Sequence, residues 1–183
     1  MGDDARVSDE TLIGRMAAGD SAAFDRLVHR HQAAVYRFAR AATAGGDAEE
    51  ILREAFEAAR RSAWRYRDET SARPWLLALA RQAIGRRNPP PAAREADADS
   101  LRELARSVGW GRDGGAWTEG PVTDAFESLP AEDREILTVC DREYFTVDEA
   151  ARVTGLSDAG VRTRLHRARL RLLARLKEDA LGD

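Results

Sequence analysis

The side chains with the most evident chemical potential are basic, and they gather near the carboxy-terminal end. Between Ser157 and Lys177 there are seven basic residues and one acid, Asp158. Guanidinium groups pair with phosphate and can donate two hydrogen bonds to guanine, so a local basic stripe is typical of a helix that contacts DNA. Composition alone favours this reading no more than it favours a solvated helix face. The stripe consists of Arg162, Arg164, Arg167, Arg169, Arg171, Arg175 and Lys177.

Other kinds of chemistry find little support in the sequence. Cys140 is the only cysteine and follows an apolar run, so we interpret it as a small buried hydrophobe. His29 and His31 are two positions apart and cannot converge on one metal from a helix, which favours a structural role. There is no glycine-rich phosphate loop, no metal-ligand spacing and no nucleophile with an evident base. We therefore expect no enzyme activity, no catalytic residues, no cofactor and no metal.

Length and composition fit a globular protein of one medium domain or two small ones. The chain has 183 residues, of which 43% are hydrophobic and 33% charged, and its formal net charge is -3. No stretch approaches the roughly 20 apolar residues that span a bilayer. The acidic start lacks an apolar signal region, so we expect a cytoplasmic protein without a membrane span.

Helical periodicity dominates the first half of the chain. Apolar residues recur at spacings of three and four, which predicts amphipathic helices at 12–16, 24–38, 51–66 and 75–84. Asp47 followed by Glu50 resembles a capping box for the third of these helices. The run 88–91, Asn-Pro-Pro-Pro, must end the block, because proline removes a hydrogen-bond donor and restricts the residue before it.

The segment that follows is poor in large apolar residues and rich in glycine. We interpret it as a flexible linker over 88–125, with a short helix at 100–108. Trp110 and Trp117 are unusual in a free linker and suggest that it docks on something, the protein's own domains included. The predicted fold class is therefore all-α, with two small helical domains at 1–87 and 126–183.

The second domain contains the pattern of a helix-turn-helix. Thr146 and Glu149 form a capping-box pair that opens a short helix, Gly155 suits a tight turn, and Ser157 caps a long final helix. In such motifs the second helix enters the major groove, where its early residues reach base edges. Its apolar positions are expected to face inward, at Leu156, Val161 and Leu165. Its outward residues are expected to be Arg162, Thr163, His166 and Arg167, with Arg164 and Arg169 toward the flanks.

Two blocks of sequence carry motifs that together are typical of one known family. The second block carries Ser128-Leu129-Pro130, Arg134-Glu135-Ile136-Leu137, Gly155-Leu156-Ser157 and the run from Val161 to Arg169. The first block carries Tyr36-Arg37-Phe38-Ala39, Asp47-Ala48-Glu49-Glu50, Glu54-Ala55-Phe56, Tyr66-Arg67 and the run from Trp75 to Arg81. With these motifs the chain resembles the extracytoplasmic-function (ECF) sigma factors. The resemblance covers roughly residues 8 to 178, with both domains in the family's order.

The resemblance implies a transcription initiation factor that directs core RNA polymerase to specific promoters and assists promoter melting. Its partners would be core RNA polymerase, promoter DNA and an anti-sigma protein. The polymerase-binding residues would be Glu50, Arg53 and Glu54. The residues for the downstream promoter element would be the loop after Tyr66 with Arg73, Trp75, Arg81, Gln82, Arg86 and Arg87. The residues for the upstream element would be Arg162, Thr163, Arg164, His166, Arg167 and Arg169.

Some positions depart from the family pattern. Arg53 replaces a neutral amide, Arg60 replaces a frequent tryptophan, Gln82 and Arg86 alter the downstream-element positions, and Gly160 replaces a threonine of the recognition helix. The departures in the polymerase-binding helix leave open the alternative of a sigma-like interaction module that binds a regulator in place of polymerase. A stand-alone repressor or activator that uses only the last domain would leave the first block unexplained.

Overall fold

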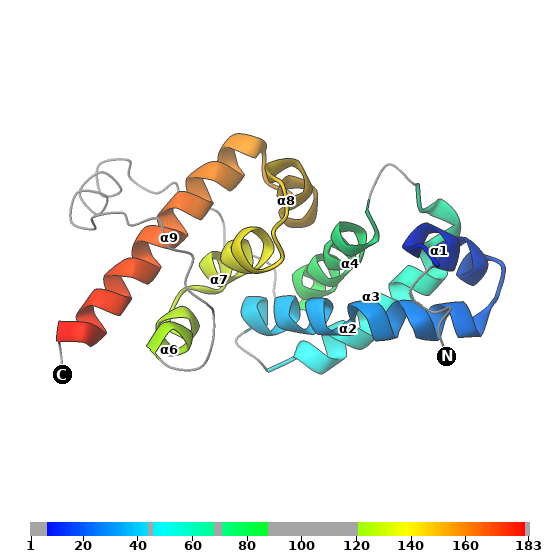
Figure 1. Cartoon of the computed structure of the whole chain (residues 1–183), viewed down its shortest axis with the longest axis horizontal. Helices are drawn as coiled ribbons and strands as arrows, with labels where there is room; N and C mark the ends of the chain where they lie inside the picture. The colour runs from blue at the N-terminus through cyan, green and yellow to red at the C-terminus, as the bar shows by residue number, and fades with distance from the viewer. Residues whose placement is uncertain (1–6, 44–45, 68–70, 88–120, 182–183) are drawn as a thin grey trace. The chain divides into compact units, whose positions relative to one another are not determined.

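The computed structural model describes residues 7–43, 46–67, 71–87 and 121–181, and all regular secondary structure in these ranges is helical (Figure 1). Apart from Arg152–Thr154, the described residues divide into two compact units, 7–87 and 121–181. The all-α prediction is confirmed. The helix expected at 100–108, Trp110, Trp117 and residues 68–70 of the loop after Tyr66 lie outside the described residues.

The first unit is built from helices that pack through leucine, phenylalanine and small alanine side chains. Its elements are α1 (Asp9–Ala17), α2 (Ser21–Thr43), α3 (Ala48–Ser62), the 3-10 turn Ala63–Arg65 and α4 (Ala72–Arg87). Helices α2, α3 and α4 each pack against the other two, and α1 packs on α2. The largest fully buried side chains here are Leu12, Ile13, Leu27, Val35, Phe38, Ile51, Leu76 and Leu77.

Local chemistry explains where these helices begin and end. The Ser8 hydroxyl accepts a hydrogen bond from the Thr11 N–H at 3.2 Å and so caps α1. Gly19 has φ +92°, a conformation that glycine adopts at no steric cost, and it separates α1 from α2. The capping box predicted at the start of α3 was wrong, because the Asp47 side chain makes no capping hydrogen bond. The Glu50 carboxylate pairs with arginine side chains instead.

The second unit gathers short helices against one long helix. Its elements are α6 (Pro121–Glu127), α7 (Ala131–Leu137), the π-helical turn Thr138–Arg142, α8 (Val147–Thr154) and α9 (Asp158–Leu181). Both α6 and α7 pack on α9. Helix α6 begins ahead of residue 126, where the sequence suggested the domain starts, and its Ala125 and Phe126 are buried.

The turns of the second unit follow the sequence prediction closely. The Thr146 hydroxyl accepts from the Glu149 N–H and the Glu149 carboxylate accepts from the Thr146 N–H, so the capping box of α8 is confirmed. Gly155 ends α8 in the left-handed region at φ +73°. The Ser157 hydroxyl accepts from the Gly160 N–H at 3.2 Å at the start of α9. A short helix, a glycine turn and a long helix therefore follow one another in the order of a helix-turn-helix.

Candidate functional site

The first turns of α9 present the side chains that the sequence predicted to face outward. Val161 is fully buried, so the helix is anchored on that side. Arg162, Thr163 and His166 are exposed, and Arg164 is half-buried. Arg162 lies 3.8 Å from Asp158, one helical turn before it, a long contact between exposed side chains. This end of α9 thus offers a cation, a hydroxyl and an imidazole to solvent.

The next arginines of α9 turn inward, toward a buried acid. The Asp133 side chain is 0% exposed and lies on α7. Its carboxylate is 2.5 Å from Arg171 and 3.7 Å from Arg167. The expectation that Arg167 lies outward was therefore wrong, since its side chain is only 13% exposed. A buried carboxylate requires counter-charges, and residues 167 and 171 are one turn apart on the same face.

Arg169 has a similar partner within the second unit. It makes two hydrogen bonds to the Asp141 carboxylate, one of them from Nε at 3.0 Å. The hydrogen bonds to Asp141 raise the pKa of Arg169. Bidentate pairing of this kind fixes the orientation of the guanidinium plane. Arg169 therefore helps to hold α9 against the π-helical turn, in addition to any contact with DNA.

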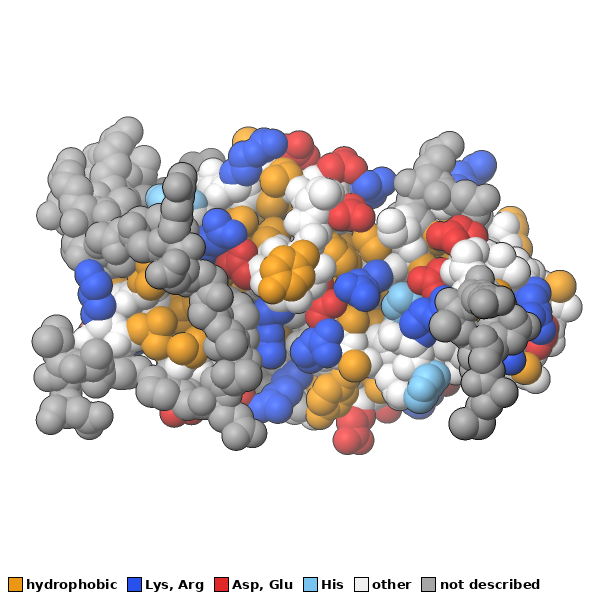
Figure 2. Space-filling model, viewed as in Figure 1, with side chains coloured by type: hydrophobic (Ala, Val, Ile, Leu, Met, Phe, Trp, Pro, Cys, Tyr) orange, Lys and Arg blue, Asp and Glu red, His pale blue; other side chains and the backbone are white. Residues whose placement is uncertain are grey.

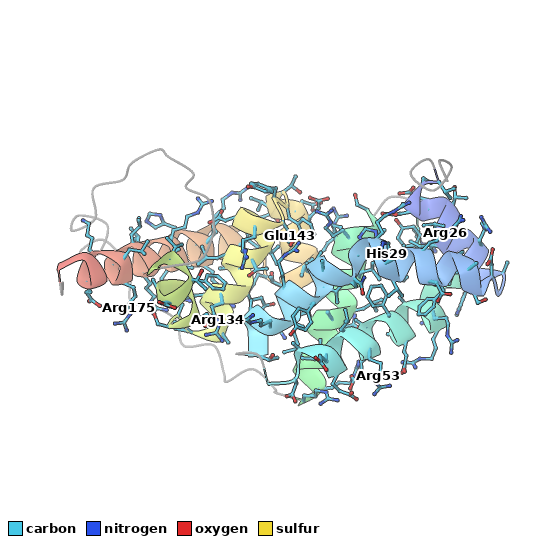
Figure 3. The ribbon with its side chains drawn as sticks, turned by 60° about the horizontal axis from the view of Figure 1, so that its bottom comes forward. Arg26, His29, Arg53, Arg134, Glu143 and Arg175 are labelled. Carbon is cyan, nitrogen blue, oxygen red and sulfur yellow. The ribbon has the colours of Figure 1, made fainter. Side chains whose placement is uncertain are left out.

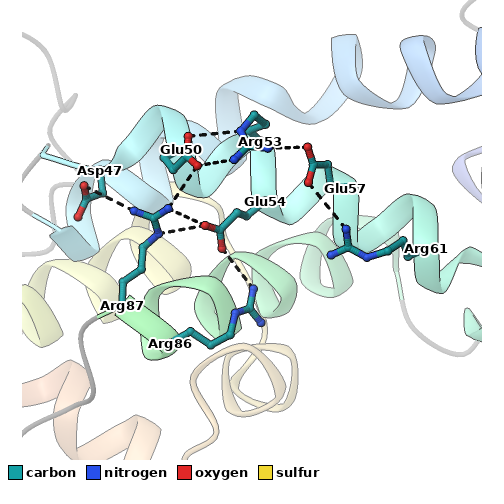
Figure 4. Close-up of polar contacts among 8 residues, drawn as sticks. All are labelled: Asp47, Glu50, Arg53, Glu54, Glu57, Arg61, Arg86 and Arg87. Atoms are coloured by element: carbon teal, nitrogen blue, oxygen red, sulfur yellow. Dashed lines mark hydrogen bonds and ion pairs between the residues drawn. The ribbon is translucent and has the colours of Figure 1, made fainter.

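In the first unit, two of the three residues expected to bind polymerase, Glu50 and Arg53, are joined by an ion pair along α3. Arg53 pairs with Glu50 and, at 2.6 Å, with Glu57, one turn to either side (Figure 4). Figure 3 shows Arg53 projecting away from the helical bundle, in agreement with its 55% exposed side chain. The two acids raise the pKa of Arg53 well above its usual range. The cation that departs from the family pattern is thus balanced by neighbours on its own helix.

The end of α4 meets the same acids. Arg87 lies 2.6 Å from Glu54 and 3.3 Å from Glu50, and Arg86 lies 3.3 Å from Glu54 (Figure 4). A longer contact of 3.9 Å joins Arg87 to Asp47. Hydrogen bonds from Arg87 lower the pKa of the Glu54 carboxyl. The structure thus brings together two groups of residues to which the sequence assigned different partners.

The remaining downstream-element candidates lie in different surroundings on α4. Arg73 and Gln82 are exposed, and Arg81 is half-buried. Trp75 is half-buried and packs against the hydrophobic core, with its ring 5.0 Å from that of Tyr66. Trp75 therefore supports the fold and remains partly accessible.

Two other residues that the sequence singled out, His31 and Cys140, lie within the fold, His31 buried and Cys140 half-buried. The His31 Nε2 atom lies 2.8 Å from the Asp9 carboxylate and ties α2 to α1, a structural contact. Burial raises the pKa of Cys140 to about 11, so its thiol stays protonated at neutral pH. Within the described ranges there is no cluster of three or more His, Cys, Asp or Glu side chains that could hold a metal. None of the described helices is long and apolar enough to cross a membrane.

The sequence matches two family descriptions, each of which covers one of the two units. Residues 27–87 match Sigma-70 region 2, and residues 120–172 match Sigma-70, region 4. ECF RNA polymerase sigma factor SigM of Mycobacterium tuberculosis is 30% identical over 90% of this chain and 83% of the relative. The chain belongs to the ECF sigma factor family. ECF RNA polymerase sigma-E factor of Escherichia coli, at 26% identity over 90% of this chain and 92% of its own length, is a more distant relative.

Solved structures agree with this ECF sigma factor fold. CnrH, solved in complex with the cytosolic domain of CnrY, has a TM-score of 0.65 and 26% identity, covering 93% of this chain and 98% of CnrH. The sigma factor RpoE of Bartonella quintana, solved with the anti-sigma factor NepR, has a TM-score of 0.62, with coverage of 84% and 96%; at 20% identity it supports the fold alone.

The function follows from the domain content and the relatives together. The protein is an ECF RNA polymerase sigma factor, a non-enzymatic transcription initiation factor of a family that binds core RNA polymerase and DNA. Its two family regions account for both sequence blocks, which a stand-alone regulator does not.

Sequence reasoning missed the acids that position the arginines of α9. Asp133 and Asp141 lie far along the chain from Arg169 and Arg171, so no local spacing pairs them. No local signal marked Asp133, because two charged residues, Arg134 and Glu135, follow it and their burial is seen only in the structure.

Proposed function

We propose that this sigma factor divides promoter binding between its two units. The first, residues 1–87, binds core polymerase and the downstream element, and the second, placed by the sequence at 126–183 and extended by α6 to Pro121, recognises the upstream element. The protein would work in the cytoplasm, where transcription takes place. The observation that carries the proposal is the helix-turn-helix whose α9 exposes Arg162, Thr163 and His166 at its start.

Upstream recognition is assigned to the exposed start of α9. The side chains at positions 162, 163 and 166 project from the turns that enter the major groove in such motifs. Arg164 and Arg169 flank them and are assigned to phosphate. Arg167 remains in the proposed surface only through its partly accessible edge, because its main contact is with Asp133.

The test of this assignment compares two arginines of the same helix. Arg162→Ala should lower discrimination between the promoter and a scrambled upstream element by about 1 to 3 kcal/mol, because a base contact is lost. Arg167→Ala should instead lower the stability of the second unit and weaken binding to both DNA sequences equally. Binding is measured by fluorescence anisotropy, and folding by circular dichroism. If Arg162→Ala weakens binding equally on both sequences, it contacts phosphate and the assignment fails.

Polymerase binding is assigned to the exposed face of α3 that carries Glu50, Arg53 and Glu54. Arg53 fits this role because Glu50 and Glu57 balance its charge, so the face does not present an isolated cation. Downstream-element binding is assigned to α4, through Arg73, Trp75, Arg81, Gln82, Arg86 and Arg87. Cations for phosphate and an accessible aromatic edge suit melted strands with unstacked bases.

A protein partner that holds this factor inactive is also proposed. The support is the likeness to CnrH, which was solved in complex with the cytosolic domain of CnrY. Such an anti-sigma protein would cover surfaces that polymerase or DNA otherwise uses. Co-expression with the products of neighbouring genes should identify one that abolishes transcription in vitro, and a neighbourhood in which no product does so would contradict the proposal.

A further inference from the structure

The network between α3 and α4 leaves its charged groups satisfied by one another. Four carboxylates, from Asp47, Glu50, Glu54 and Glu57, face four guanidinium groups, from Arg53, Arg61, Arg86 and Arg87 (Figure 4). The opposite charges balance. In the free protein this surface therefore offers neither a net negative face to a basic partner nor a net positive face to nucleic acid.

The network has two parts that share Glu50. Along α3, Arg53 and Arg61 pair with Glu57 at 2.6 and 3.7 Å, and Arg53 also pairs with Glu50; these are contacts within one helix. Between helices, Arg87 and Arg86 reach from α4 to Glu54 and Glu50. Only the second part ties the two helices together.

The contacts between helices are suited to exchange. Their side chains remain accessible, from 24% exposed at Glu54 to 57% at Arg86. Ion pairs of this exposure are individually weak and are screened by salt, so a partner of the right charge can replace either side. Removal of the carboxylates would leave two adjacent arginines in the last turn of α4, ready to bind phosphate.

We propose that Glu54, with Glu50, forms an exchangeable latch that holds Arg86 and Arg87 away from DNA until a basic surface of the polymerase takes over the acids. This inference rests on the proposed assignment of α3 to polymerase. Polymerase binding and DNA binding then favour each other. Polymerase takes the acids away from the arginines, and DNA takes the arginines away from the acids; such coupling is reciprocal. The first unit gains its DNA affinity as the complex forms.

The primary test measures DNA binding by the free, full-length protein in the absence of polymerase. Glu54→Gln should raise affinity for a fluorescent duplex of random sequence at low salt, roughly threefold for each arginine released. The dependence of log affinity on log salt should become steeper by about one to two units. Circular dichroism confirms that the variant is folded.

Matched variants separate the latch from the change in net charge. Glu57→Gln removes the same charge from the same helix, but Glu57 pairs with Arg53 and Arg61, so its effect on DNA affinity should be much smaller. Adding Arg86→Ala and Arg87→Ala to Glu54→Gln should cancel the gain. Equal gains from Glu54→Gln and Glu57→Gln, or a gain that survives without the arginines, would overturn the proposal.

Polymerase affinity, measured without DNA, distinguishes failure of the latch from failure of the site. The double variant Arg86→Ala with Arg87→Ala should bind core polymerase at least as tightly as the wild type at low salt, because the acids are freed. Weaker binding by that variant would overturn the latch. If Glu50→Gln and Glu54→Gln leave polymerase affinity unchanged, the proposed polymerase site is wrong. Polymerase would then not release the arginines, even if Glu54→Gln raises DNA affinity.

Discussion

Asp133 holds two arginines of the basic stripe, Arg167 and Arg171, against the fold of the second unit. Its carboxylate is completely buried and takes Arg167 and Arg171 as counter-charges. The side chains of α9 that remain exposed ahead of that pairing include Arg162, Thr163 and His166. A count of basic residues overestimates the DNA-facing charge of such a helix, because part of that charge stabilises the domain.

Removal of this acid should be costly. Asp133→Ala leaves Arg167 largely buried without its counter-charge, and we expect a loss of about 3 kcal/mol in the free energy of unfolding of the second unit. Urea unfolding followed by circular dichroism measures it. Glu132→Ala is the neighbouring control, since residue 132 is exposed, and it should change stability little. Equal effects of the two variants would contradict the assigned role of Asp133.

His31 gives the first unit a pH dependence. Burial lowers the pKa of His31 below its ordinary value of 6.5, against an opposing effect of the Asp9 carboxylate and with smaller contributions from Arg73 and Arg30. The unfolded chain then binds the proton more readily than the folded one. The contribution of His31 to the free energy of unfolding is fully present above pH 6.5, and it decreases as the pH falls toward the folded-state pKa.

Proton NMR can follow the His31 imidazole directly, with its signal assigned by its loss in His31→Gln. We expect a titration midpoint below 6.5. The wild type should lose stability between neutral pH and pH of about 5.5, and His31→Gln should lose less over the same interval. A midpoint above 6.5 would mean that the Asp9 carboxylate outweighs burial.

At the scale of the elements, the sequence predicted the caps and turns that depend on residues close together in the chain. The capping box at Thr146, the left-handed Gly155 and the Ser157 cap are local, and all are confirmed. The capping box expected at Asp47 failed for a tertiary reason, since Glu50 is held by Arg53 of its own helix and by Arg87 of α4. The latch and the Asp133 pairing join distant segments, so periodicity could not reveal them.

The capping box should contribute measurably to the helix-turn-helix. Thr146→Ala removes the side chain that accepts the Glu149 N–H, and the expected loss is about 1 kcal/mol in the free energy of unfolding. Thr146→Ser keeps the acceptor and should restore most of it. Urea unfolding of the full chain, with DNA affinity as a second readout, gives the comparison. A serine variant as unstable as the alanine variant would show that the hydroxyl is not what matters.

At the scale of the whole molecule, opposite charges are interspersed. The formal net charge is -3, and the face in Figure 2 shows Lys and Arg side chains among Asp and Glu and hydrophobic ones. General attraction to DNA is therefore weak, and promoter affinity must come from local surfaces such as the start of α9. This distribution supports the proposal that the first unit gains its DNA affinity in the complex with polymerase.

The most direct test of the account is run-off transcription on fragmented genomic DNA with purified core RNA polymerase and this protein. We expect a stable complex with core polymerase and discrete transcripts that require the added protein. Arg162→Ala should reduce those transcripts without loss of the complex, because it lies in the second unit and faces solvent. A folded protein that forms no complex with core polymerase and yields no discrete transcripts would contradict the account, and would favour a sigma-like module that binds a regulator.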